Sequence, residues 1–339
     1  MNDKIIDYLI IGGSVAGSVL AAKLAEHGST LFVDRYLPGT LMNCGGGMPQ
    51  KVFDAFAVDI PTLPINQGIM KIGAKEYSFP CHYVVVNRSE FDHALYQKAC
   101  NAGAEFRQMS FRGYDAETKI AHFSEHGQPV MINYNKLILA NGFHPVKEPF
   151  SGTARVAERG AARVEIIATE AVHRAAFYFE IYQQTPGYSW IFPMPDGRIN
   201  IGTGGFLRDF DFKNIFEQFK VAENITGEIE VKGGGVLPLK PVRIIQQGAV
   251  SLFGDSAGMI NALNGEGLMH IERCSHRYAQ ALITGKNLNL LWLSSFTYWY
   301  LLLAAYCLKL FLLIDKIFRL QLYSSACRLV IAVRNLLPD

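Results

Sequence analysis

IIDYLII, residues 5–11, runs directly into GGSVAG, residues 12–17, and this junction decides the fold. A nearly continuous apolar run of this length is typical of a strand buried on both faces of a parallel sheet. Residues 18–27 then have the composition of a helix, and residues 30–33 that of a second strand. A strand, a glycine turn, a helix and a strand in this order predict a βαβ unit that binds a dinucleotide.

Each small or acidic residue of this unit has a physical role. Gly12 permits the tight turn out of the strand, and Gly17 lets the helix pack closely on the sheet. The helix N-terminus directs its dipole and free N–H groups at a pyrophosphate, with Ser14 where the fingerprint has its second glycine. Asp34 ends the second strand and is placed to accept hydrogen bonds from a ribose. The predicted nucleotide-binding residues are Gly12, Gly13, Ser14, Ala16, Gly17, Asp34 and Arg35.

Composition limits the classes of function that the chain can have. With 339 residues, half of them hydrophobic, it can form one large domain or two interleaved ones. The 32 basic and 30 acidic residues give a net charge of +2, so we expect no nucleic-acid partner. The six cysteines form no CxxC pair and the nine histidines lack ligand spacing, so we expect no metal and free thiols in a reducing cytoplasm.

Three later segments resemble a flavoprotein superfamily that includes aromatic hydroxylases, flavin-dependent halogenases and geranylgeranyl reductases. VNRSEFDHAL (86–95) is similar to a helix start whose arginine approaches the flavin nucleotide, and LILANG (137–142) ends a strand where the family has Asp-Gly. LFGDSAG (252–258) and NGEG (264–267) resemble the ribityl-binding turn and the helix start at the flavin pyrimidine edge. The resemblance implies FAD as the cofactor. The further cofactor residues that it implies are Arg88, Gly142, Gly254, Asp255, Gly265, Glu266 and Gly267.

Two motifs resemble the geranylgeranyl reductase branch of this superfamily. NCGGG (43–47) looks like a Cys-Gly-rich loop beside the flavin ring, which implies that Cys44 and Gly45 contact the cofactor. YSWIFP (188–193) is followed by GTG (202–204), as in the branch's signature. The residues that the resemblance assigns to an apolar substrate are Tyr188, Trp190, Phe192 and Gly204.

The aromatic residues of this signature alternate, so they project from one face of a strand. Asp196-Gly197 predicts a hairpin turn that returns the chain beside it. Flat rings line a pocket for a long apolar chain without demanding hydrogen bonds. The alternative is that the rings fill a sheet core and that Cys44 is a buried thiol packed beside a glycine turn.

The chemistry that these motifs imply is FAD-dependent reduction of carbon–carbon double bonds in an isoprenoid lipid or pigment chain. An isolated alkene needs a hydride on one carbon and a proton on the other, and we hypothesise that Cys44 assists the protonation. The electron donor is left open among NAD(P)H, a ferredoxin, or another carrier or donor protein. Two alternatives are a flavin-dependent monooxygenase or halogenase, and a membrane flavoprotein that passes electrons to quinone.

The C-terminal region suggests contact with a membrane. Residues 287–308 carry no charge and form either a membrane-spanning helix or a buried helix packed on the enzyme. Beyond them, basic residues alternate with Leu, Ile and Phe, which is the composition of an interfacial helix. We therefore expect a cytoplasmic protein, peripheral on the cytoplasmic face of the membrane, with an integral C-terminal helix as the alternative.

The fold class predicted from these segments is α/β. A Rossmann-like FAD-binding domain takes residues 1–55, 86–150 and 245–285, and an interleaved β-rich substrate domain takes residues 56–85 and 150–245. The segment 286–339 is predicted to be a C-terminal helical segment that associates with a membrane.

Overall fold

A computed structural model of the chain describes residues 5–41, 43–143, 159–169, 176–181, 187–206, 211–318 and 325–329. The chain divides into two compact units, each assembled from three separate segments. The first unit comprises Met1–Leu41, Ser89–Arg155 and Pro238–Leu303, and the second comprises Met42–Arg88, Val156–Leu237 and Ala304–Asp339.

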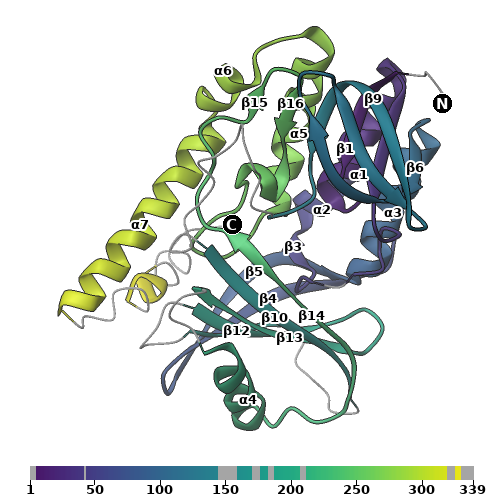
Figure 1. Cartoon of the computed structure of the whole chain (residues 1–339). Coiled ribbons are helices and arrows are strands. Elements are labelled where there is room, and N and C mark those ends of the chain that lie inside the picture. Colours follow the sequence, from purple (N-terminus) through teal and green to yellow (C-terminus); the bar gives the residue numbers. More distant parts are fainter. Residues whose placement is uncertain are drawn as a thin grey trace. The chain divides into compact units, whose positions relative to one another are not determined.

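The first unit contains a mostly parallel sheet with β1 in its interior (Figure 1). The strand order is β15-β16-β9-β1-β2-β6, and every neighbouring pair except β15–β16 is parallel. β8 pairs with β9 and β7 in antiparallel fashion. The strands are β1 (Ile6–Ile11), β2 (Thr30–Asp34), β6 (Glu105–Gln108), β7 (Ser110–Asp115), β8 (Ile120–Glu125), β9 (Gln128–Leu139), β15 (Gln246–Gln247) and β16 (Val250–Leu252). The apolar run of β1 is thus buried between two parallel neighbours, as predicted.

Helices follow the strands of this sheet, and α1 packs against α5. They are α1 (Val15–Leu24), α3 (Arg88–Asn101), α5 (Leu268–Thr284), α6 (Leu288–Leu293), the start of α7 (Phe296–Phe318), and the 3₁₀ turns Ala25–His27 and Gly254–Ala257. The βαβ unit predicted from the sequence is therefore confirmed.

The uncharged stretch 287–308 is divided between two helices. The Asn287 side chain caps α6 by accepting hydrogen bonds from the N–H groups of Asn289 and Leu290. α6 ends before Ser295, whose hydroxyl accepts a hydrogen bond from the N–H of Tyr298 in the first turn of α7. In the part of the chain that the structure describes, no helix has the length and hydropathy needed to cross a membrane.

The second unit is dominated by one large sheet, which confirms the prediction of a β-rich part. Its strand order is β14-β10-β13-β12-β11-β4-β5-β3. The strands are β3 (Gly47–Pro49), β4 (Thr62–Ile72), β5 (Lys75–Val86), β10 (Arg159–Ala168), β11 (Phe177–Ile181), β12 (Gly187–Pro193), β13 (Ile199–Phe206) and β14 (Glu228–Pro238), and the helices are α2 (Gln50–Phe56) and α4 (Phe212–Ala222). The predicted hairpin is present, since Pro193 pairs with Ile199 and Gly197 has a φ of +86°.

The two faces of this sheet bury different side chains. Ile191, Ile199 and Ile201 pack on one face with Phe216 and Phe219 of α4. Trp190 and Phe192 lie on the other face, in a cluster with Ile65, Cys81, Val85, Val164, Ile166 and Met194. The period-2 alternation of β12 therefore separates an aliphatic face from an aromatic one.

These two sheets confirm the predicted α/β class. One sheet is mostly parallel, the second unit is rich in strands, and helices lie near the C-terminus. The chain passes from one unit to the other at residues 41/42, 88/89, 155/156, 237/238 and 303/304. The sequence predicted domain changes at 55/56, 85/86, 150, 245 and 285/286. The assignment of FAD and substrate to separate domains stays a prediction.

Gly202 gives a direct test of the packing on the aromatic face. A Cβ at Gly202 would lie 2.1 Å from the Trp190 ring, whereas a Cβ at Gly204 would come no closer than 3.6 Å to any atom outside its chain neighbours. We expect Gly202→Ala to lower the free energy of unfolding by about 1–3 kcal/mol through overpacking. Gly204→Ala is the matched control and should cost clearly less. Urea denaturation of both variants measures the difference, and equal losses would contradict the packing described.

Candidate functional site

Two glycines make the turn between β1 and α1 sterically possible. Gly12 has a φ of +113°, and a Cβ there would lie 2.3 Å from the carbonyl oxygen of Ala140. A Cβ at Gly17 would lie 1.8 Å from the carbonyl oxygen of Gly12. No larger residue fits at either position without moving backbone, so the turn brings the N-terminus of α1 close to the end of β1.

Asp34 closes this turn from the end of β2. One carboxylate oxygen accepts a hydrogen bond from the N–H of Gly13 at 2.8 Å, and the other accepts one from Tyr36 at 3.3 Å. The half-buried carboxylate still has lone pairs for hydroxyl donors, because each oxygen can accept more than one hydrogen bond. Arg35 is exposed, and its guanidinium lies 4.9 Å above the centre of the Tyr36 ring.

Ser14 has a partner that the sequence did not reveal. Its hydroxyl donates a 2.6 Å hydrogen bond to the carboxylate of Asp92, which is 4% exposed on α3. A glycine at position 14 would lack this bond. The serine in place of the fingerprint's second glycine therefore ties the phosphate-binding type of turn to α3.

The turn after β16 packs against the start of α1. Gly254 has a φ of +67°, and a Cβ there would lie 2.7 Å from the Cβ of Ala16. Asp255 follows it, and its carboxylate lies near Gly267, where a Cβ would be 3.7 Å away. Ser256 donates a 2.8 Å hydrogen bond to the carbonyl oxygen of Gly142, beyond the end of β9. Three motifs that are far apart in the sequence thus meet at the carboxyl ends of parallel strands.

Glu266 caps the helix that follows it. Its carboxylate accepts a 2.6 Å hydrogen bond from the N–H of Met269 in the first turn of α5. The loop before it is closed by Asn261, which exchanges backbone hydrogen bonds with Gly265 and Glu266. The N–H group of Met269 is therefore already hydrogen-bonded. Fewer backbone N–H groups at the start of α5 are left for the predicted contact with a flavin.

His270 lies next to this cap, and it is one of the nine histidines whose spacing predicts no metal site. It is 2% exposed, its Nε2 lies 3.6 Å from Glu266, and its ring packs against Tyr300. Neither ring nitrogen has a hydrogen-bond partner among the described residues. Burial, with a contribution from Arg273, lowers the pKa of His270 to about 4, and burial raises the pKa of Glu266. The imidazole is therefore neutral at physiological pH.

These features of the first unit fit a bound dinucleotide. The turns at Gly12 and Gly254 leave no room for a Cβ, while a Cβ at Gly142 would meet no atom within 4 Å. A helix N-terminus without an acidic residue in its first turn suits a pyrophosphate, and Asp34 suits a ribose. The described residues contain no group of three or more His, Cys, Asp or Glu that could hold a metal ion.

In the second unit, Asn200 joins the Cys44 loop to the aromatic row. Its side-chain oxygen accepts a 2.9 Å hydrogen bond from Nε1 of Trp190, and its Nδ2 donates a 3.0 Å hydrogen bond to the carbonyl oxygen of Cys44. Gly45 lies close to the same rings, since a Cβ there would be 2.8 Å from Phe192. The two motifs assigned to the geranylgeranyl reductase branch are therefore adjacent. The sequence signal for this connection is a polar residue, Asn200, between Ile199 and Ile201, and its role was not predicted.

The aromatic row is mostly buried. Trp190 and Phe192 are 6% and 8% exposed, and the Tyr188 ring lies 5.8 Å from that of Trp190. Burial, and next the charge of Cys44, raise the pKa of the Tyr188 hydroxyl, so it stays protonated at neutral pH. The rings thus belong to a packed cluster, and Gly204 lies opposite Tyr188 on β13. The substrate role of all four residues stays a prediction.

Arg88 begins α3, and its side chain passes Gly46, where a Cβ would lie 3.6 Å from its Cγ. Gly46 itself has a φ of +79° and pairs with Val86, so the Cys44 loop is fixed to the end of β5. Arg88 and the loop are therefore neighbours within the second unit, as the cofactor assignment of both requires.

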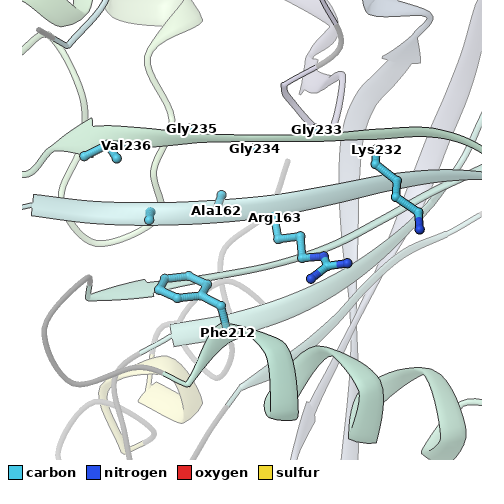
Figure 2. Close-up of a pocket in the computed structure, with 9 residues that line it drawn as sticks. Ala162, Arg163, Phe212, Lys232, Gly233, Gly234, Gly235 and Val236 are labelled. Carbon is cyan, nitrogen blue, oxygen red and sulfur yellow. The ribbon is translucent and has the colours of Figure 1, made fainter.

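A cavity of about 480 Å³ lies elsewhere in the second unit, beside the glycines of β14. Figure 2 shows Arg163, Phe212 and Lys232 around it. Arg163 stacks over Phe216 of α4, so the part of the cavity that Arg163 lines is on the α4 face of the sheet. The rings of Trp190 and Phe192 occupy the opposite face. Ala162, which also lines the cavity, packs against the cluster of Trp190 and Phe192 and pairs with Gly204 on β13.

Comparison with known proteins gives relatives along most of the chain, although no family model matches it. The chain is 24% identical to geranylgeranyl diphosphate reductase, chloroplastic, of Oryza sativa subsp. japonica, over 81% of this chain and 66% of that protein. It is 26% identical to digeranylgeranylglycerophospholipid reductase of Thermoplasma acidophilum, over 77% and 74%. The chain thus spans slightly less than two thirds of the rice protein.

Solved structures share the fold. A geranylgeranyl bacteriochlorophyll reductase-like protein of Thermoplasma acidophilum superposes with a TM-score of 0.72 at 20% identity, covering 97% of this chain and 88% of that one. The FAD-dependent chondrochloren halogenase of a myxobacterium superposes with a TM-score of 0.66 at 14% identity, covering 83% and 75%. At these identities the likeness establishes the fold.

Asn200 is predicted to stabilise the second unit. Asn200→Ala removes the acceptor for the buried Trp190 N–H and the donor to Cys44, and an unsatisfied buried group costs about 1–3 kcal/mol. Urea denaturation should show this loss. Asn135→Ala, which removes an exposed hydrogen bond to Asp7, is the control and should change stability by less than about 0.5 kcal/mol. Equal effects would mean that Asn200 is not a structural link.

His270 is predicted to make stability depend on pH. Its pKa in the folded state is about 4, below the unfolded value of about 6.5, so the folded state binds fewer protons between these values. Stability should therefore fall as the pH drops through this range, by up to about 2 kcal/mol at about pH 5. His270→Phe should lose less on acidification, as measured by urea denaturation at about pH 7.5 and 5. The raised pKa of Glu266 acts in the opposite direction and remains in both proteins. Parallel losses in the two proteins would exclude His270 as the cause.

Proposed function

We propose that this relative of the geranylgeranyl reductases is an FAD-dependent oxidoreductase that reduces carbon–carbon double bonds in an isoprenoid chain. The observation that carries the proposal is the adjacency of the Cys44 loop and the Tyr188 motif through Asn200. These two segments are the ones that resemble the geranylgeranyl reductase branch, and they are about 140 residues apart along the chain.

The first unit is proposed to hold FAD. The α1 N-terminus with Gly12, Gly13 and Ser14 would face the pyrophosphate, and Asp34 the adenosine ribose. Asp255 would hold the ribityl chain and the start of α5 the pyrimidine edge. FAD would supply the hydride for alkene reduction. The proposed cofactor residues on the first unit are Gly12, Gly13, Ser14, Ala16, Gly17, Asp34, Arg35, Gly142, Gly254, Asp255, Gly265, Glu266 and Gly267.

The second unit is proposed to contribute the substrate contacts and the proton. Cys44 and Tyr188 lie close enough for the thiol to influence the pKa of the phenol. Burial keeps the Tyr188 hydroxyl protonated, so it can donate a hydrogen bond and help to hold the Cys44 side chain. We assign proton delivery to Cys44, cofactor contact to Gly45 and Arg88, and the apolar wall to Tyr188, Trp190, Phe192 and Gly204.

A lipid substrate places the enzyme at a membrane surface, and we propose peripheral contact on the cytoplasmic face. The electrons are proposed to come from a separate donor, either a nicotinamide nucleotide, a ferredoxin or another carrier. Anaerobic mixing of the oxidised protein with each of these donors, followed by flavin absorbance, identifies the one that reduces it.

The test of the function is anaerobic turnover. Reduced protein is mixed without oxygen with geranylgeranyl diphosphate or with a digeranylgeranylglycerophospholipid in detergent, and the return of oxidised flavin absorbance is followed with mass spectrometry of the lipid. We expect reoxidation together with a mass gain of two hydrogens per double bond. Reoxidation only by oxygen with halide, or only by quinone, would replace the proposal with a halogenase or a quinone reductase.

Cys44→Ala tests the proton donor in the same assay. Loss of a positioned acid lowers the rate of such a step by about 10²–10⁴-fold, and FAD content should not change. Cys100→Ala, on α3, is the matched thiol control and should keep the wild-type rate. An unchanged rate in Cys44→Ala would leave its thiol with a packing role.

A further inference from the structure

A cleft in the first unit combines arginines with apolar walls. It measures about 260 Å³ and is lined by Arg273 and Arg277 of α5, by Leu291 and Trp292 of α6, and by Phe296 at the start of α7. Its other lining residues include no aspartate or glutamate. A space with cationic and apolar walls together suits a molecule with an anionic and an apolar part.

The two arginines lie close to each other, and Arg273 is also near enough to Glu266 to counteract part of the rise that burial causes in the pKa of that carboxyl. They are exposed and one helical turn apart on α5, where like charges destabilise a helix by about 0.2–0.5 kcal/mol. Among the described residues, no carboxylate forms an ion pair with either guanidinium. An external anion would relieve this repulsion, and a guanidinium binds a phosphate with two parallel hydrogen bonds.

An exposed apolar surface continues from the cleft. Phe296 is 80% exposed, Trp299 58% and Leu303 62%, and they follow one another at helical spacing on α7. Leu290 on α6 is 68% exposed. The same spacing continues along α7 through Tyr306, Leu310 and Leu313, each more than half exposed. The opposite side of the helix is buried through Leu301, Ala304, Ala305 and Leu308.

This exposed row differs from the scattered apolar residues of an ordinary surface. Its members form one continuous face of a helix, and such faces mark contact with a membrane or a partner. The only charge between residues 296 and 313 is Lys309, which is exposed and basic. Aromatic rings such as Phe296, Trp299 and Tyr306 suit the boundary between headgroups and acyl chains.

We propose that Arg273, Arg277 and the exposed face of α6 and α7 form a docking surface for anionic phospholipids in a membrane. The arginines bind headgroup phosphates, while Leu290, Phe296, Trp299 and Leu303 enter the acyl region. α7 lies in the plane of the interface. This docking surface rests on the proposed function, because an enzyme with a lipid substrate reaches that substrate at a membrane. The lipids that recruit the enzyme are anionic phospholipids.

Vesicle flotation of the full chain tests the surface. We expect binding to phosphatidylcholine vesicles that contain phosphatidylglycerol, and much weaker binding to phosphatidylcholine alone. High salt and alkaline carbonate should release the protein. Equal capture by both vesicles, no capture by either, or retention after carbonate washing would overturn the proposal. If the protein binds inorganic phosphate but shows no preference for the anionic vesicles, the arginines would instead be assigned to a soluble anion.

Matched variants localise the surface. Arg273→Gln with Arg277→Gln should weaken binding to the anionic vesicles about 25-fold, or roughly fivefold for each arginine. Phe296→Ser with Leu303→Ser should weaken it by roughly tenfold or more. The controls are Arg112→Gln with Lys119→Gln, which remove two exposed charges on the β7–β8 hairpin, and Met131→Ser, which removes an exposed apolar side chain on β9. Controls that weaken binding as much as the test variants would refute the assignment.

Turnover of detergent-dispersed substrate separates this proposal from the proposed reductase. The arginine variant should keep wild-type turnover in detergent while losing vesicle binding. A wild-type protein that turns over substrate in detergent but ignores vesicles would refute docking alone. One that binds anionic vesicles but reduces no prenyl substrate would refute the reductase function alone.

Discussion

The first unit depends on the close approach of two backbone segments at the end of β1. The carbonyl oxygen of Gly12 occupies the position where a Cβ of residue 17 would stand, and Ala140 of the neighbouring segment occupies the corresponding position at Gly12. The start of α1 is therefore held close to the end of β1. Because Gly254 then packs against Ala16, the turn after β16 takes its place from α1. One steric constraint thus aligns the three motifs assigned to the cofactor.

The fold was predictable where the signal is local. The apolar run of β1, the glycine turn and the hairpin at Asp196-Gly197 each follow from backbone preferences within a few residues. The division of residues 287–308 into two helices was not predicted, because hydropathy averages over Asn287 and Ser295 and hides their capping hydrogen bonds. The unit boundaries depend on contacts between distant segments, which no local pattern contains.

The site was predictable as a set of motifs but not as a network. Ser14 looked like an imperfect fingerprint, and its bond to Asp92 joins residues 78 positions apart. Asn200 carries no signal in the predicted motifs, yet it connects Trp190 to Cys44. Glu266 was assigned to a flavin contact, yet its carboxylate also holds the first turn of α5. Single polar residues take their meaning from partners that only the folded chain brings near.

The missing Cβ of Gly202 has a consequence for variation at this sheet. Because the Trp190 ring fills that space, the two positions are sterically coupled, and the size of each residue limits the size of the other. A larger residue fits at position 202 only after Trp190 has been replaced by a smaller residue. Substitution at one position alone therefore gives a destabilised protein. Attempts to reshape the aromatic face for a different isoprenoid length should therefore treat the pair as one unit and change both residues together.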